Sequence, residues 1–129
     1  MKHGRAGKKL ERNRNGRRAL VRSLVESLVI HGRIRTTEAR AKELKSRIDR
    51  VLNAAKESHF AVDPARRIAV KRSLRSRYSS STCDRLDDSE FIQNLSERKS
   101  GYSRVVKLPP RRGDGARMSI IEIVDVQPL

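Results

Sequence analysis

Side chains that could act as nucleophiles, general bases or metal ligands are few and scattered in this sequence. His3, His31 and His59 lack the i,i+4 spacing and the neighbouring carboxylate of a helical metal site. The single cysteine, Cys83, can form neither an intrachain disulfide nor a cysteine-based zinc cluster. The serine run 79–81 has no glycine elbow and no charge-relay partner. We therefore expect no catalysis, no metal or other cofactor, and no small-molecule substrate.

Positive charge is the chemical property that dominates the chain. Lys and Arg number 31 against 15 acidic residues in a chain of 129, which gives a net charge of +16. Residues 1–22 hold nine of these basic side chains and one acid, Glu11, so they carry half of the net charge. This imbalance calls for a polyanionic partner. Because aromatic residues make up only 3% of the chain, phosphate contacts rather than rows of stacked bases should supply the affinity.

Nucleic acid and an anionic membrane surface are the two polyanions to consider. No run of the sequence approaches the roughly 18 apolar residues of a spanning helix. The amino terminus also lacks the apolar stretch of a secretory signal. We expect a cytoplasmic protein with no membrane partner, and an organellar origin stays open.

A second basic segment lies near the carboxyl end, where Arg111 and Arg112 precede Gly113 and Asp114. The tripeptide Arg-Gly-Asp in it is too short to indicate cell adhesion in a chain without secretory context. A basic loop whose glycines let the backbone approach a phosphate is the better interpretation, with Asp114 bonding locally to shape the turn.

The elements that must position these charges are predicted from periodicity and capping. Residues 1–16 form a basic arm that cannot bury a core, and a helix is expected over 17–31. Gly32 ends this helix, and the histidine before it suits the negative helix end. An extended stretch, 34–37, supplies a threonine that caps a helix over 37–57, whose apolar residues recur at i, i+3, i+4 and i+7. The charged outer face of that helix, which carries Arg40, Glu43, Arg47 and Arg50, is expected to be mostly solvated.

A third helix is predicted to begin at Asp63-Pro64, because Asp caps and Pro is preorganised for the first helical position. It should run to about Arg77 and it contains many basic residues and no acid. Two interpretations remain open: a solvated helix, or a second surface that contacts RNA.

The rest of the chain is predicted as a loop, a short helix and two strands. Residues 79–86, which include Cys83, are polar and aperiodic and should form a flexible loop. Asp87 or Asp88 can cap the short helix that follows. Strands rich in Val and Ile are expected at 103–108 and 118–126.

Several segments of the chain, taken in order, resemble one family of proteins. These segments are MKHGRAGKKLERN, RRALVRSLVESLVIHGRI, TTEARAKELKSRID, GYSRVVKL, RRGDGARM and SIIEIV. They resemble the bacterial large-subunit ribosomal protein family conventionally numbered seventeen, and they cover residues 1–57 and 101–124. Residues 58–100 align poorly with the family. Gly16 stands where members typically have His, and Lys2 where they have Arg.

The resemblance implies an α+β fold, with three to four helices packed on a small mixed β-sheet and an extended basic amino-terminal arm. It divides the chain into an arm over 1–16, a single domain over 17–126 and a tail over 127–129. The implied role is that of a structural constituent of the large ribosomal subunit in the cytoplasm. The implied partners are 23S ribosomal RNA, near the rim of the nascent-chain exit tunnel, and the large-subunit proteins numbered three, twenty-two and thirty-two.

Charge and resemblance together predict the RNA-binding residues. They are Lys2, His3, Arg5, Lys8, Lys9, Arg12, Arg14, Arg17, Arg18, Arg22, Arg35, Thr36, Thr37, Lys42, Arg104, Lys107, Arg111 and Arg112.

Two other functions compete with this interpretation. A DNA-packing protein would also be small and basic, but the chain shows no evident β-ribbon arm or intercalating apolar wedge. An RNA-processing enzyme should offer a convergent acid/base or metal set, and the sequence offers none.

Overall fold

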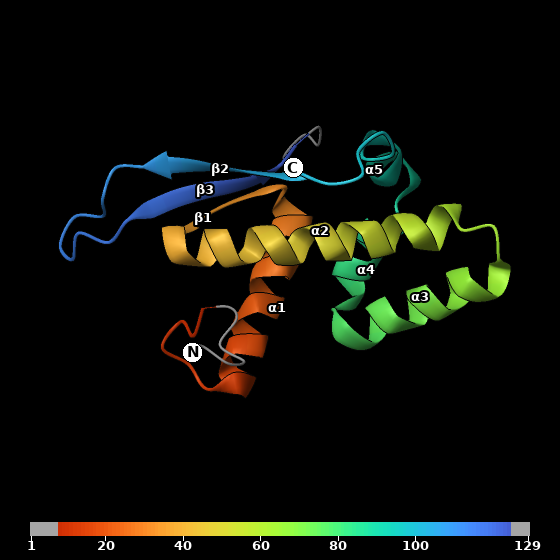
Figure 1. Ribbon diagram of the computed structural model, residues 1–129, viewed down its shortest axis with the longest axis horizontal. Helices are drawn as coiled ribbons and strands as arrows, with labels where there is room; N and C mark the ends of the chain where they lie inside the picture. The colour runs from red at the N-terminus through yellow and green to blue at the C-terminus, as the bar shows by residue number, and fades with distance from the viewer. Residues whose placement is uncertain (1–7, 125–129) are drawn as a thin grey trace, which may run out of the picture.

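The computed structural model describes residues 8–124 of the chain. The elements follow one another as α1 (Arg14–His31), β1 (Arg33–Thr37), α2 (Glu38–Phe60), α3 (Pro64–Arg77), α4 (Ser80–Leu86), α5 (Ser89–Asn94), β2 (Ser103–Leu108) and β3 (Met118–Ile123). Figure 1 shows α2 as a long central helix, with α1, α3 and the sheet arranged around it. The expected α+β class is confirmed. Five helices are present over the described range, where three to four were expected.

The sheet has the strand order β1-β3-β2, and both pairings are antiparallel. The expectation of a mixed sheet was therefore wrong. The chain returns through a loop from β2 to β3, and β3 then runs back towards the start of β1, where Ile123 N donates to Gly32 O at 2.9 Å. Ile120 lies between Arg35 on one side and Val106 on the other. β1, expected only as an extended stretch, is thus a full edge strand of the sheet.

The helix ends follow capping chemistry, with one difference from expectation. Asn13 accepts a hydrogen bond from Gly16 N at 2.7 Å, and α1 therefore begins at Arg14, before the expected start at residue 17. Gly32 ends α1 as predicted, with a φ of 72° that glycine adopts without strain. Asp63 caps α3 as predicted, accepting from the N–H of Ala65.

α2 needs a different explanation, because the side chain of Thr37 makes no capping hydrogen bond. The expected threonine cap was wrong. The first N–H of α2, that of Glu38, donates instead to the carbonyl of Arg117 at 2.9 Å. The β2–β3 loop is thereby joined to the start of α2.

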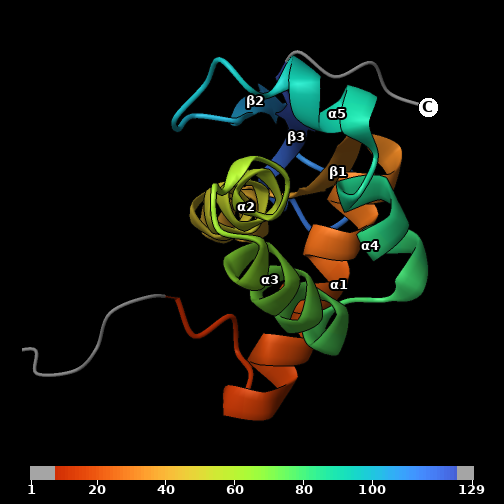
Figure 2. The ribbon, with the colours of Figure 1, turned by 90° about the vertical axis from the view of Figure 1, so that its right-hand side faces the viewer.

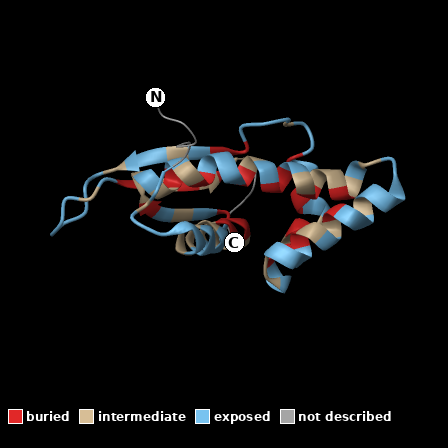
Figure 3. Ribbon diagram, turned by 60° about the horizontal axis from the view of Figure 1, so that its bottom comes forward, coloured by how far each residue is buried: buried red, intermediate tan, exposed pale blue. Residues whose placement is uncertain are grey.

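The core lies along α2. Leu44, Ile48, Leu52 and Ala55 are fully buried, as their spacing predicted. Figure 2, which looks along α2, shows the sheet on one side of this helix and α3 on the other. Figure 3 colours the chain by burial: buried positions lie along the inner face of α2, and exposed positions lie on the outer face of α3 and in the β2–β3 loop. The sheet and α3 therefore both pack against α2.

Residues 80–86 form helix α4, so the expected flexible loop was wrong. Thr82, Cys83 and Leu86 are buried in it, which also corrects the interpretation of Cys83 as a small loop residue. The buried Thr82 hydroxyl has a partner within the protein, because it lies 3.0 Å from the hydroxyl of Ser79. Asp88 then caps α5, as predicted for one of the two aspartates.

Candidate nucleic-acid interface

The described part of the arm turns immediately before α1. Leu10 and Glu11 have φ values of 52° and 53°, an uncommon backbone region for non-glycine residues, and Arg12 N donates to Lys9 O at 3.2 Å. Lys8, Lys9 and Arg12 are exposed. None of these three forms an ion pair within residues 8–124. The turn therefore presents free positive charge beside the start of α1.

Some of the expected arm residues cannot be placed. Lys2, His3 and Arg5 lie outside the described residues, as do the expected tail over 127–129 and the last two positions of the expected strand 118–126.

A groove of about 810 Å³ opens between α1, α2 and α3. We call it the arginine groove, because arginines reach it from all three helices: Arg14, Arg17, Arg18 and Arg22 from α1, Arg47 and Arg50 from α2, and Arg77 from α3. The rest of the lining is Val21, Val25, Val51, Ala54, Leu74, Ser76 and Tyr78. We call these residues other than the exposed Ser76 the floor, because they are buried or half-buried. Among the described residues no acidic side chain lines the groove.

The arginine groove combines expected residues with residues that sequence reasoning missed. The arginines of α1 were expected to bind RNA, and the structure brings all four to one wall. Arg47 and Arg50 were assigned to a solvated face of the second helix, and the structure places them on the opposite wall. Arg77 belongs to the helix for which an RNA-contacting face was left open. Periodicity identifies helix faces but does not show which faces converge.

A second basic region surrounds the β2–β3 loop, which projects beyond the start of α2 at the end of the molecule opposite the α2–α3 turn (Figure 1). Gly113 and Gly115 turn this loop with φ values of 101° and 64°. Arg35 on β1 and Arg112 in the loop are exposed and have no ion pair within the described range. Lys107 is 80% exposed and lies 4.0 Å from Glu38.

Other basic residues expected to bind RNA already have acidic partners in this second region. These ion pairs are Lys42 with Glu38, Arg104 with Glu122, and Arg111 with Asp114. The Arg104 and Arg111 pairs are each 2.6 Å long. Their charge is balanced locally, which makes these side chains weaker candidates for phosphate contacts than their unpaired neighbours.

Hydrogen bonding to these cations lowers the pKa of two of the acids. The Arg111 guanidinium, followed by the N–H of Ala116, holds the pKa of Asp114 at about 2. The Lys42 ammonium lowers the pKa of Glu38, against an opposing effect of burial. Both carboxylates are therefore charged at neutral pH, and Asp114 shapes the loop locally as expected.

The two expected threonines lie on opposite faces of β1. Thr36 is 7% exposed and is aligned with Ser119, a fully buried position of β3. Because Thr36 is buried, its side chain is not available for contact with RNA. Thr37 is half-buried and is aligned with Met118.

Side chains that could do chemistry are not assembled into a site over residues 8–124. No group of three or more His, Cys, Asp or Glu residues is placed there to hold a metal ion. His31 is the exposed last residue of α1, at the negative end of the helix, as predicted. Burial raises the pKa of the Cys83 thiol, which lowers its reactivity. None of the helices over residues 8–124 combines the length and the apolar composition of a membrane-spanning segment.

Comparison with known proteins gives one consistent result. The family model described as ribosomal protein L17 matches residues 20–124. A large ribosomal subunit protein bL17 from Rubrobacter xylanophilus is 39% identical over 125 residues, which covers 97% of each chain. Proteins of the same name from Levilactobacillus brevis and Staphylococcus haemolyticus are 40% and 38% identical, each over 92% of this chain and 98% of the relative.

Proposed function

The chain belongs to the ribosomal protein L17 family, and from this premise we propose that it is a structural constituent of the large ribosomal subunit in the cytoplasm and binds ribosomal RNA. The observation that carries the proposal is the similarity to bL17 proteins along nearly the full length of both chains. The net charge of +16 attracts the chain to RNA over a distance, and the basic side chains without an acidic partner make the phosphate contacts. The protein performs no reaction, and its contribution is to hold folded RNA in place.

The RNA in this proposal is 23S ribosomal RNA. Its main anchor is the unpaired positive charge of the arm and of α1: Lys8, Lys9, Arg12, Arg14, Arg17 and Arg18. Arg35 on β1 and Arg112 in the β2–β3 loop give a second contact. Because the sheet lies on one side of α2 and the arm with the start of α1 on the other (Figure 2), one chain can bridge two RNA segments. Folded-RNA shape rather than base reading then supplies the specificity.

The proposed position in the subunit is near the rim of the nascent-chain exit tunnel. Its proposed protein neighbours are the large-subunit proteins numbered three, twenty-two and thirty-two. The sequence resemblance supports both statements. Crosslinking within intact subunits, read by mass spectrometry, tests them: crosslinks to these three proteins are expected, and crosslinks only to proteins distant from the tunnel would contradict the placement.

Sedimentation tests the proposed function as a whole. A cell extract is separated in a gradient, and the chain is located by mass spectrometry before and after a high-salt wash. The chain should follow the large subunit through the wash. A chain that stays with the nucleoid would instead indicate DNA packing, and one that stays at the top of the gradient would overturn the ribosomal assignment.

A further inference from the structure

The arginine groove contains more positive charge than the fold itself uses. Arg22 pairs with Glu26 at 3.3 Å, and Arg47 pairs with Glu43 at 3.4 Å. The other five arginines of the lining have no ion pair within residues 8–124. Like charges brought together from three helices repel one another, so the folded chain gains nothing from this convergence by itself. An external polyanion would relieve the repulsion.

The floor of the groove is chemically different from its walls. Val25, Val51 and Leu74 are buried there, and Tyr78 stands at their edge as the residue that ends α3. A duplex presents phosphates and sugars at its surface, which would satisfy the walls but not the floor. An unpaired nucleotide carries a phosphate and an exposed base, and bases of this kind commonly contact aromatic side chains. The combination of walls and floor therefore favours a single strand.

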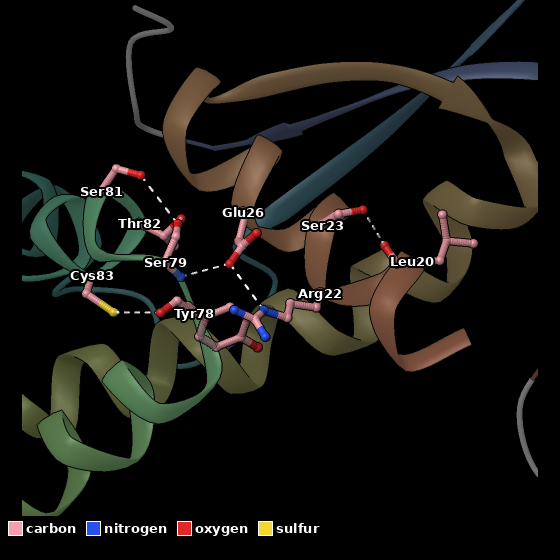
Figure 4. A network of polar contacts seen from close by, with 9 residues as sticks. All are labelled: Leu20, Arg22, Ser23, Glu26, Tyr78, Ser79, Ser81, Thr82 and Cys83. Atoms are coloured by element: carbon pink, nitrogen blue, oxygen red, sulfur yellow. Dashed lines mark hydrogen bonds and ion pairs between the residues drawn. The ribbon is translucent and has the colours of Figure 1, made fainter. Parts of the chain in front are cut away.

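The junction between α3 and α4 holds the groove open in a fixed form. Glu26 Oε1 accepts from Ser79 N at 2.8 Å and from Arg22 Nε, so α1 is tied to the residue that follows Tyr78. Figure 4 shows Glu26 between Arg22 and Ser79, with Tyr78 alongside. Tyr78 N donates in turn to Leu74 O at 3.0 Å. A preformed site loses less entropy when a ligand binds.

We propose that the arginine groove binds an unpaired segment of RNA, with its phosphates between the arginines of α1 and those of α2 and α3, and with one base on the apolar floor against Tyr78. This proposal rests on the proposed function and deepens it, because it names the site for an unpaired nucleotide. Burial raises the pKa of Tyr78, and the phenol is therefore neutral at physiological pH and able to donate a hydrogen bond. An acidic peptide would match the walls but would have no use for a floor that accepts a flat ring.

Binding of the full-length chain to a short labelled single-stranded RNA of mixed sequence tests the walls. The test variant replaces Arg50 and Arg77 by Gln, and the matched control replaces Arg40 and Arg72, which lie on the same two helices outside the groove lining. Log K falls as log salt rises, and we give the slope of this plot as its magnitude. The test variant should lower this magnitude by about 1.4, at about 0.7 for each lost phosphate contact on a single strand. The control should leave the slope unchanged. Equal slopes for the two variants would overturn the proposal.

The floor is tested separately by Tyr78→Leu, with the helical signal checked by circular dichroism. Affinity for the single strand should fall by roughly five-fold or more while the salt slope stays constant, because stacking is not ionic. The same RNA presented as a duplex should bind with no dependence on Tyr78. A Tyr78→Leu variant that binds both RNAs like the unchanged chain overturns the base contact, as does an equal loss on both.

Two further outcomes separate this proposal from the proposed function. If replacing Lys8, Lys9 and Arg12 of the arm by Gln weakens binding to ribosomal RNA while the groove variants bind as well as the unchanged chain, the groove proposal fails and the function stands. If the unchanged chain binds no ribosomal RNA and does not sediment with the large subunit, the proposed function itself fails. A labelled oligoglutamate peptide that binds in an Arg50- and Arg77-dependent way more tightly than RNA also overturns the groove proposal.

Discussion

The arginine groove and the region around the β2–β3 loop are both rich in basic side chains, but the two regions neutralise them differently. Around the loop, Arg104 and Arg111 each have an acidic partner 2.6 Å away. In the groove, Arg14, Arg17 and Arg18 have none within residues 8–124. A paired cation shapes its own surface, whereas an unpaired cation remains available to an external anion. A count of basic residues therefore overstates the positive charge that the loop region offers to RNA and understates the charge that the arginine groove offers.

The largest effect is expected from substitutions in the core of α2, because α2 positions both regions. Leu44→Ala and Ile48→Ala should each lower the free energy of unfolding by about 2–5 kcal/mol, the range for truncating a buried aliphatic side chain. Both side chains are fully buried. Urea denaturation measures the change. A loss below about 0.5 kcal/mol in both variants, the range of surface substitutions, would show that α2 does not carry the core.

The second largest effect is expected when only the unpaired charge is removed. We expect a variant with six glutamines in the arm and α1 to lose most of its salt-dependent RNA binding while its helical signal persists. The six positions are Lys8, Lys9, Arg12, Arg14, Arg17 and Arg18. The slope of log K against log salt should fall by about 4 to 5, at roughly 0.7–0.9 per phosphate contact. An unchanged slope with an intact fold would move the anchor to the loop.

A smaller effect is expected from substitution of Glu26. This acid does not line the groove, but it ties α1 to the residue that follows Tyr78. Glu26→Ala leaves Ser79 N without its acceptor, which should cost about 1–3 kcal/mol of stability. Hydrogen exchange at the Ser79 amide should become faster. Glu26→Gln keeps an acceptor oxygen and serves as the control. Equal exchange rates in the Ala variant and the unchanged chain would mean that the junction is held by other contacts.

The smallest effect is expected when the acidic partner of a paired cation is removed. Asp114→Asn frees Arg111 and should raise the salt slope by at most one contact, about 0.7–0.9. In the unchanged chain the pKa of Asp114 is lowered to about 2 from 3.8. The pair's stabilisation is therefore complete above about pH 3.8 and is lost as the pH falls towards 2. A carboxyl titration by NMR with a midpoint near 3.8 would show that the pair does not persist in solution.

Local chemistry was sufficient to predict most helices and strands from the sequence. Leu44 and Ile48 have helical spacing, and Asp63 with Gly32 mark helix ends through interactions within a few residues. The sequence did not reveal α4, because its polar residues look solvated until Ser79 meets Glu26, a contact between residues 53 positions apart in the chain. The strand pairing of β1 with β3 was missed for the same reason.

The candidate interface was predictable in part, and the limit is again physical. The dense charge of the arm and α1 indicated the RNA-binding side chains directly. The convergence of Arg50 and Arg77 on the same groove depends on how α2 and α3 pack. The pairing of Arg104 with Glu122 depends on strand register. Both are tertiary facts that neither periodicity nor composition contains.

The central claim, that unpaired cations rather than net charge determine RNA binding, is tested most directly by two variants with the same charge change. One replaces Arg14, Arg17 and Arg18 by Gln, and the other replaces the paired residues Lys42, Arg104 and Arg111. The salt dependence of binding to 23S ribosomal RNA is measured for both. The first variant should lower the slope by about 2 to 3, at roughly 0.7–0.9 per contact, and the second by less than one contact. Equal reductions in the two variants would contradict the claim, because net charge alone would then explain the binding.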